Sequence, residues 1–289
     1  MYTRIITKFC NCVYLEKYPI VMIRRNELAI RISYSYLSVS DICIANCFLV
    51  ASSHKPMGSI SVGRVIHRGV DVENIYEGMR VVLFPINSPR YLETLGGAQE
   101  VAVIDHHYVK PAEFKNYSDI ETMLIAMLSV ESDVVDLVKG KDILIMGNDI
   151  SLLTFAYYAS RYSCRIGTIP KLTINSKVLK GEHVSLHNSD KKFETIVVAT
   201  PDPTAICLAI KNLAAHKATI ILYPQLNKLL NGICINNKEI RMATIGLGNM
   251  QIGIEIFENF KEFLMKEITI IDHEDLTEHV SRPLILRFR

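Results

Sequence analysis

The chain has 289 residues, of which 49% are hydrophobic and 21% are charged, and its 32 basic and 30 acidic residues leave a net charge of +2. This balance gives no general attraction to nucleic acid, and no apolar run reaches the roughly eighteen residues that a membrane-spanning helix needs. Seven scattered cysteines indicate reduced thiols, and the N-terminus lacks the pattern of a signal peptide. We therefore expect a cytoplasmic protein that binds neither nucleic acid nor membrane.

Short β-rich segments bounded by glycine, proline and asparagine fill the first part of the chain and predict a compact β domain. They lie at residues 28–36, 60–67, 79–84 and 98–104. Residues 119–138 follow, with apolar side chains three or four positions apart, which is the spacing of a helix with one buried face.

From residue 142 onward, strands and helices alternate. Apolar strands are predicted at 143–146, 165–169, 196–199 and 219–223, and helices at 151–162, 203–215 and 252–263. Continuous apolar strands between helices are typical of a parallel sheet that helices cover on both faces. The polar stretch 171–188 has little periodicity and is the most linker-like part of the chain.

Several segments also carry a family resemblance in their order and spacing. Ile30–Asp41 reads like a strand followed by Cys-Gly-Ser-Asp, Met57–Val65 like Leu-Gly-His-Glu-x-x-Gly-x-Val, Leu124–Val130 like Leu-Leu-Glu-Pro-Leu-Ser-Val, Asp142–Gly147 like a first nucleotide-domain strand, and Arg282–Phe288 like a closing strand. Together they resemble the medium-chain dehydrogenase/reductase superfamily, which includes the zinc-type alcohol dehydrogenases. The resemblance implies an α/β fold with two domains. One is a GroES-like, β-barrel-type domain split between residues 1–112 and 246–289, and the other is a doubly wound parallel Rossmann-like domain at 113–245.

The three positions that the resemblance assigns to zinc ligands hold Ser38, Ser59 and Ala126. Catalytic zinc needs three nitrogen, sulfur or oxygen ligands from the protein plus one open position. Two serines and an alanine do not supply that set, so we expect no zinc. Ser40 matches the family's proton-relay hydroxyl, but without a zinc-bound alkoxide it has nothing to deprotonate, and we expect an ordinary satisfied hydroxyl there.

The predicted nucleotide-binding turn is altered as well. A Gly-x-Gly-x-x-Gly turn uses its glycines for the tight turn, for the approach of the pyrophosphate and for helix packing. Here the turn begins Gly147-Asn148-Asp149, and of the three glycines only Gly147 remains. A carboxylate of Asp149 at the helix start caps the free N–H groups and repels a phosphate, which together disfavour the cofactor by roughly 1–3 kcal/mol. We expect no bound dinucleotide.

Two further positions bear on which dinucleotide would bind. The second strand of this domain does not end in the carboxylate that holds the ribose hydroxyls of NAD. Lys171 lies there instead; it would favour the 2′-phosphate of NADP, or it is a solvated surface lysine. Thr200 lies where the family's nicotinamide ribose runs, and it suits an ordinary strand-to-helix turn equally well.

Two functions therefore remain open. The first is a non-catalytic binding or assembly subunit whose zinc and dinucleotide sites are degenerate. The alternative is a zinc-independent NADP(H)-dependent oxidoreductase, similar to the quinone and enoyl reductases of the superfamily, that acts on a small carbonyl or alkene. In that alternative the catalytic hydroxyls are Ser38, Ser40 and Ser59. The cofactor contacts are then Gly147, Asn148, Asp149, Lys171 and Thr200.

Other metal-binding side chains occur without a standard zinc spacing. Cys43 and Cys47 are interpreted as ordinary thiols. Asp105, His106 and His107 directly follow a predicted strand, where alternate side chains point to opposite faces, so we expect surface histidines and no shared site.

The segment 229–245 contains the last predicted strands of the second domain, in which isoleucines alternate with small or polar residues. An unpaired apolar edge strand promotes aggregation unless it is covered. Dimers in the family pair such edges into one continuous sheet, so the resemblance implies a homodimer, or a heterodimer with a related chain, through this segment.

Overall fold

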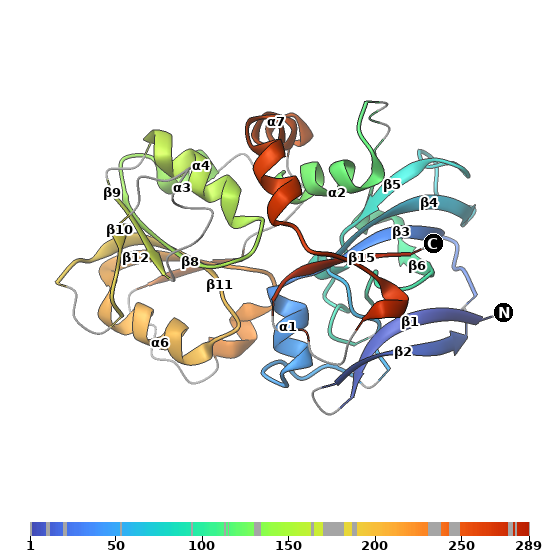
Figure 1. The fold of residues 1–289 in the computed structure, drawn as a ribbon, viewed down its shortest axis with the longest axis horizontal. Coiled ribbons are helices and arrows are strands. Elements are labelled where there is room, and N and C mark those ends of the chain that lie inside the picture. Colours follow the sequence, from blue (N-terminus) through green and yellow to red (C-terminus); the bar gives the residue numbers. More distant parts are fainter. Residues whose placement is uncertain are drawn as a thin grey trace. The chain divides into compact units, whose positions relative to one another are not determined.

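The computed structural model describes residues 2–9, 12–19, 22–52, 54–93, 95–112, 114, 116–129, 134–162, 165–169, 182–186, 190–230, 238–242, 249–276, 280 and 282–288. The chain divides into two compact units (Figure 1). The first unit contains both ends of the chain, Met1–Ala126 and Phe260–Arg289, and the second unit is Met127–Asn259.

An extended β-sheet forms the centre of the first unit. Its strands are β3 (Glu27–Leu37), β4 (Ile60–Arg68), β5 (Arg80–Leu83), β6 (Val101–Asp105), β7 (Val109–Pro111), β14 (Ile270–Asp272) and β15 (Leu284–Arg287). They run in the order β14-β15-β3-β4-β5-β7, with β6 also paired to β3. The pairs are antiparallel except β14 with β15. Alternate side chains of β3, among them Leu28, Ile30 and Ile32, enter one apolar core, as the period of a strand requires.

An N-terminal hairpin, which the sequence pattern did not predict, packs on this unit. β1 (Tyr2–Phe9) and β2 (Cys12–Pro19) pair antiparallel. Ile5, Ile6 and Val13 are buried. The backbone of Ile6 accepts a hydrogen bond from the Met57 N–H and donates one to the Ala98 carbonyl, both 2.8 Å long. These bonds attach the hairpin to the segment that carries Ser59.

Helices and short turns complete the first unit. They are α1 (Val39–Ala45), α2 (Asp119–Leu128), η1 (Pro85–Asn87), η2 (His106–Tyr108) and η4 (His273–Asp275). The last two residues of α2 belong to the second unit.

The second unit is a parallel sheet with helices on both faces. Its strands are β8 (Asp142–Gly147), β9 (Arg165–Ile169), β10 (Glu182–His183), β11 (Phe193–Ala199), β12 (Ala214–Leu222) and β13 (Glu239–Met242), in the order β10-β9-β8-β11-β12-β13. Its helical elements are α3 (Val134–Val138), α4 (Leu152–Tyr162), α6 (Pro203–Asn212), η3 (Leu226–Leu230) and α7 (Met250–Glu267), which continues into the first unit. Figure 1 shows α4 and α6 on opposite faces of the sheet. This arrangement confirms the predicted doubly wound α/β architecture.

Several element boundaries differ from the predictions. The helix predicted at 119–138 ends at Leu128, whose carbonyl accepts a hydrogen bond from Thr154 Oγ1 at 2.9 Å, and α3 begins at Val134. The helix predicted at 203–215 ends at Asn212, because the chain enters β12 at Ala214. Within the linker-like stretch 171–188 the described residues include β10, while Lys171 lies outside the described residues.

None of the helices in the described part of the chain combines the length and the apolar character that crossing a bilayer requires.

Candidate functional site

Ser38 and Asp41 begin α1 as a capping box. Ser38 is the N-cap: its Oγ accepts a hydrogen bond from the Ser40 N–H at 3.1 Å, and Asp41 Oδ2 accepts the Ser38 N–H at 3.0 Å. Reciprocal bonds of this kind satisfy backbone donors that the first turn of a helix leaves free. The local sequence therefore fixes the Asp41 carboxylate beside the Ser38 hydroxyl.

The same carboxylate gathers donors from two other segments. The Gly58 N–H donates to Asp41 Oδ1 at 2.8 Å, and Ser59 Oγ donates to Asp41 Oδ2 at 2.6 Å. The hydroxyls of Ser38 and Ser59 are also hydrogen-bonded to each other. Tyr91 donates its phenol hydrogen to Asp41 Oδ1 at 2.6 Å. We call Ser38, Asp41, Ser59 and Tyr91 the serine–aspartate network.

Every member of the serine–aspartate network is 0% exposed. A carboxylate that is removed from water to this extent is destabilising unless hydrogen-bond donors surround it. Sequence reasoning identified Ser38 and Ser59 and missed the central role of Asp41. It also missed Tyr91, for which no motif gives a signal.

A buried lysine lies against this network. Lys55 is 3% exposed, and its Nζ lies 3.9 Å from the centroid of the Tyr91 ring and donates to the Pro56 carbonyl at 2.8 Å. Burial lowers the pKa of Lys55 to about 8, although the charge of Asp41 acts in the opposite direction. The arrangement places a cation beside the aromatic face and near the buried carboxylate.

Cys43 lies on α1 with its thiol buried. Burial, together with the charge of Asp41, raises the pKa of the Cys43 thiol to about 12. Because the thiolate is the form that attacks substrates, the raised pKa disfavours Cys43 as a nucleophile near neutral pH.

In the second unit, Gly147 ends β8 beside the end of β11. Gly147 pairs with Ala199, and Thr200 follows directly. Gly147 has φ +115°, and a Cβ added to it would lie 1.8 Å from the Ala199 carbonyl oxygen, so the turn requires glycine. Strand order reverses between β8 and β11, which is where sheets of this type hold their ligands.

Asp149 occupies the start of α4. Its side chain is buried at 1% exposure, and Oδ1 accepts hydrogen bonds from the Ser151 N–H at 3.1 Å and from the Ser151 hydroxyl at 2.8 Å. Asn148 is exposed. The carboxylate therefore satisfies donors at this end of the helix by itself.

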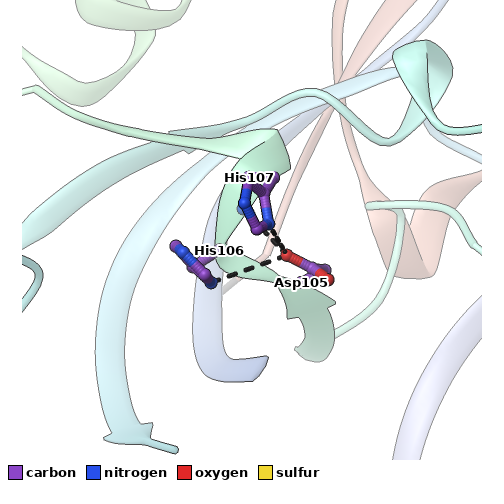
Figure 2. A group of neighbouring side chains, drawn as sticks. All are labelled: Asp105, His106 and His107. Carbon is purple, nitrogen blue, oxygen red and sulfur yellow. Dashed lines mark hydrogen bonds and ion pairs between the residues drawn. The ribbon is translucent and has the colours of Figure 1, made fainter. Parts of the chain in front are cut away.

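The structure overturns one expectation. Asp105, His106 and His107 do not alternate between opposite faces, because the chain leaves β6 and enters the 3-10 turn η2. One ligand atom from each side chain lies within 4.8 Å of the other two (Figure 2). Within the described part of the chain, these three side chains form the group whose ligand atoms lie close enough together to hold a metal ion. Cys43 and Cys47 do not belong to it.

Comparison with known proteins identifies solved structures that share this fold. No family model matches the sequence, and no curated protein matches it. Among solved structures, acetophenone reductase from Geotrichum candidum in complex with NAD has a TM-score of 0.70 at 14% identity and covers 99% of this chain and 97% of its own. The quinone oxidoreductase from Coxiella burnetii has a TM-score of 0.67 at 14% identity, with 100% of both chains covered. CAD from Helicobacter pylori, complexed with NADP(H), has a TM-score of 0.65 at 14% identity and covers 99% of this chain and 98% of its own.

This chain has the medium-chain dehydrogenase/reductase fold. The likeness confirms the fold that the sequence resemblance implied, with a GroES-like and a Rossmann-like part.

Within the medium-chain dehydrogenase/reductase fold, the residues present do not fit a catalytic zinc ion. The hydroxyls of Ser38 and Ser59 are bonded to each other and to Asp41, and Ala126, buried on α2, has no ligand atom. A neutral hydroxyl does not replace the thiolate and imidazole that zinc prefers.

The start of α4 does not fit a pyrophosphate either. The anion would meet the buried carboxylate of Asp149 where the fold's nucleotide-binding members rely on free N–H groups. Among the described residues, Gly147 and Thr200 lie where neighbouring parallel strands end, at the reversal of strand order. Lys171, the predicted contact with a 2′-phosphate, lies outside the described residues.

Proposed function

We propose that this chain is a non-catalytic binding or assembly subunit built on an oxidoreductase fold. The buried carboxylate of Asp149 at the start of α4 carries the proposal. Carboxylate and phosphate are both anions that compete for the same helix N-terminus. Asp149 is part of the chain, so its hydrogen bonds form without the entropy loss of binding a ligand.

The serine–aspartate network supports the same proposal in the first unit. Oxidoreductase chemistry on this fold needs a group that stabilises the oxygen of the substrate, either a metal ion or a free hydroxyl. The Ser38 and Ser59 hydroxyls are used inside the protein instead, and both are fully buried. The network therefore contributes to stability and leaves these hydroxyls without a free donor for a substrate.

The assembly role rests on β13, the terminal strand of the second unit's sheet among the described residues. Ile240 on β13 is 39% exposed, and an apolar edge strand is stabilised when another strand covers it. We propose that a second copy of this chain pairs with it about a two-fold axis, or that a related chain does so. The compartment proposed is the cytoplasm, in keeping with the free thiols of Cys43 and Cys207.

Light scattering on the purified protein at micromolar concentration tests the assembly role. The proposal predicts a dimer mass, and a monomer mass for Ile240→Lys. Ile270→Lys is the matched control, because Ile270 is 42% exposed on β14, an end strand of the other sheet. A wild-type monomer, or a dimer that Ile240→Lys leaves intact, contradicts the proposal.

The second candidate is a zinc-independent NADP(H)-dependent oxidoreductase for a small carbonyl or alkene. The whole-length likeness to structures that hold NAD or NADP(H) favours it, as does the position of Gly147 and Thr200 at the reversal of strand order. An assay that follows NADPH consumption by its absorbance, with a panel of quinones, enones and aldehydes as substrates, tests this candidate. Turnover that Gly147→Val abolishes would establish this candidate in place of the first.

A further inference from the structure

We propose that Asp105, His106 and His107 form a surface site for a divalent transition-metal ion, a role independent of both candidate functions. The three side chains come from the end of β6 and the turn η2. Figure 2 shows both imidazoles directed toward the Asp105 carboxylate. Two imidazoles and one carboxylate are a ligand set that suits zinc, nickel, copper and iron, and such a set leaves coordination positions open.

The distances are close to those around a bound ion. Asp105 Oδ1 lies 2.7 Å from His107 Nδ1 and 3.6 Å from His106 Nδ1. Zinc–ligand distances of about 2.0–2.2 Å place neighbouring ligand atoms about 3.3 Å apart in a tetrahedron. The two observed distances lie on either side of that value. Small rotations of the imidazole side chains therefore bring the ligand atoms to the spacing that an ion requires.

The turn holds its ligands before any ion arrives. Asp105 Oδ1 accepts the His107 N–H at 2.9 Å, which fixes the carboxylate above the 3-10 turn. The two rings lie with centroids 4.2 Å apart and planes tilted by 38°.

Asn26 orients the group from a second segment, the turn before β3. Its side-chain amide donates to Asp105 Oδ2 at 2.5 Å, and its carbonyl accepts the His106 N–H at 3.1 Å. The same carbonyl lies 2.9 Å from His106 Nδ1, a contact that this nitrogen gives up when it binds an ion. Amide partners of this kind orient a ligating carboxylate, and their loss costs about 10–100-fold in affinity. Asn26 is therefore a positioning residue of the proposed site.

An ion can reach the site from solvent. The His107 side chain is 71% exposed, while those of His106 and Asp105 are each 31% exposed. Water molecules can fill the remaining coordination positions, so the site requires no rearrangement of the core.

Calorimetric titration of tag-free, chelator-treated full-length protein with Zn²⁺ and Ni²⁺ tests the site, with Mg²⁺ as the oxygen-seeking comparison ion. The proposal predicts saturable binding of one Zn²⁺ or Ni²⁺ per chain and none of Mg²⁺. His107→Ala and Asp105→Asn should each weaken binding at least about tenfold, and the latter keeps an acceptor for the turn. Asn26→Ala should weaken it about 10–100-fold.

His67→Ala is the matched control, because His67 is a comparably exposed histidine that lies 3.0 Å from the Glu77 carboxylate. It should leave binding unchanged. The Co²⁺ spectrum of the wild type should show nitrogen and oxygen coordination that His107→Ala removes. An absence of saturable Zn²⁺ and Ni²⁺ binding overturns the proposal, and so does affinity that is equal in wild type and His107→Ala.

Discussion

Ser38 and Ser59 are hydrogen-bonded to each other through their hydroxyls, and both also contact the same oxygen of Asp41. The superfamily resemblance places zinc ligands at these two positions. Here the two side chains satisfy one another and the buried carboxylate, so a hydrogen-bond network connects the start of α1 to the residue before β4.

We predict that no zinc occupies the site at Ser38 and Ser59. Metal analysis should be carried out on His107→Ala, so that the proposed surface site does not contribute. Less than about 0.1 zinc per chain is expected, because hydroxyls are poor zinc ligands. One tightly held zinc per chain would contradict this. In the same background, Ser38→Cys with Ser59→His should raise zinc uptake, since the two changes restore a thiolate and an imidazole.

Asp41 should be the most sensitive position of the network. Asp41→Ala leaves the Gly58 N–H, Ser59 Oγ and Tyr91 hydroxyl without their buried acceptor. Each buried donor left unsatisfied costs about 1–3 kcal/mol, so the free energy of unfolding should fall by more than about 3 kcal/mol in urea denaturation. A loss below about 1 kcal/mol would show that the network does not stabilise the fold.

Tyr91→Phe removes the hydrogen bond of the phenol to that carboxylate and its contact with Ser59 Oγ but leaves the carboxylate in place, which predicts a smaller loss of about 1.5–3 kcal/mol. Tyr76→Phe serves as the control. Tyr76 is 53% exposed, so its loss of the hydroxyl should change stability by less than about 0.5 kcal/mol. Equal effects of the two substitutions would argue against a special role for the Tyr91 hydroxyl.

Lys55 should make stability depend on pH. Its folded pKa is about 8 against an ordinary 10.5, so between these values the unfolded chain binds more protons than the folded one. The free energy of unfolding contributed by Lys55 therefore rises with pH across this window, and below pH 8 the burial penalty is present in full. At about 1.4 kcal/mol per pKa unit the rise is on the order of 3 kcal/mol.

Lys55→Met keeps the apolar stem over Tyr91 and removes the charge. Urea denaturation at pH 7, 8, 9 and 10 should show this variant more stable than wild type at pH 7, with the difference shrinking toward pH 10. Subtraction of the two curves removes the titration of groups that both proteins share, such as Cys43. A difference that stays constant over this range would rule out a lowered pKa of Lys55.

The strand and helix periodicity of the sequence predicted the architecture well because it reflects burial. The segment predicted at 28–36 lies in β3. The helix predicted at 151–162 matches α4 (Leu152–Tyr162) except at its first residue, which lies in a turn. The N-terminal hairpin was not predicted, since Ile5, Ile6 and Val13 are buried through bonds to residues 57 and 98, which lie far away in sequence.

The sequence predicted only part of the candidate site, again because contacts between residues far apart in sequence leave no local pattern. Alignment to motifs identified Ser38, Ser59 and Asp149. It gave no sign that Tyr91 bonds to Asp41 or that Lys55 lies over the Tyr91 ring, because these residues approach one another only in the folded chain. For Asp105, His106 and His107 the strand rule was applied one residue too far, since a 3-10 turn starts at His106.

Calorimetric titration of the purified wild-type protein with NADPH tests the central claim, that a side chain occupies the place of the cofactor's pyrophosphate. We expect no saturable binding up to millimolar NADPH, and detectable binding in Asp149→Gly, which removes the carboxylate from the start of α4. A micromolar dissociation constant for wild type, about −8 kcal/mol, would instead establish a functional nucleotide site and disprove the blocking role of Asp149.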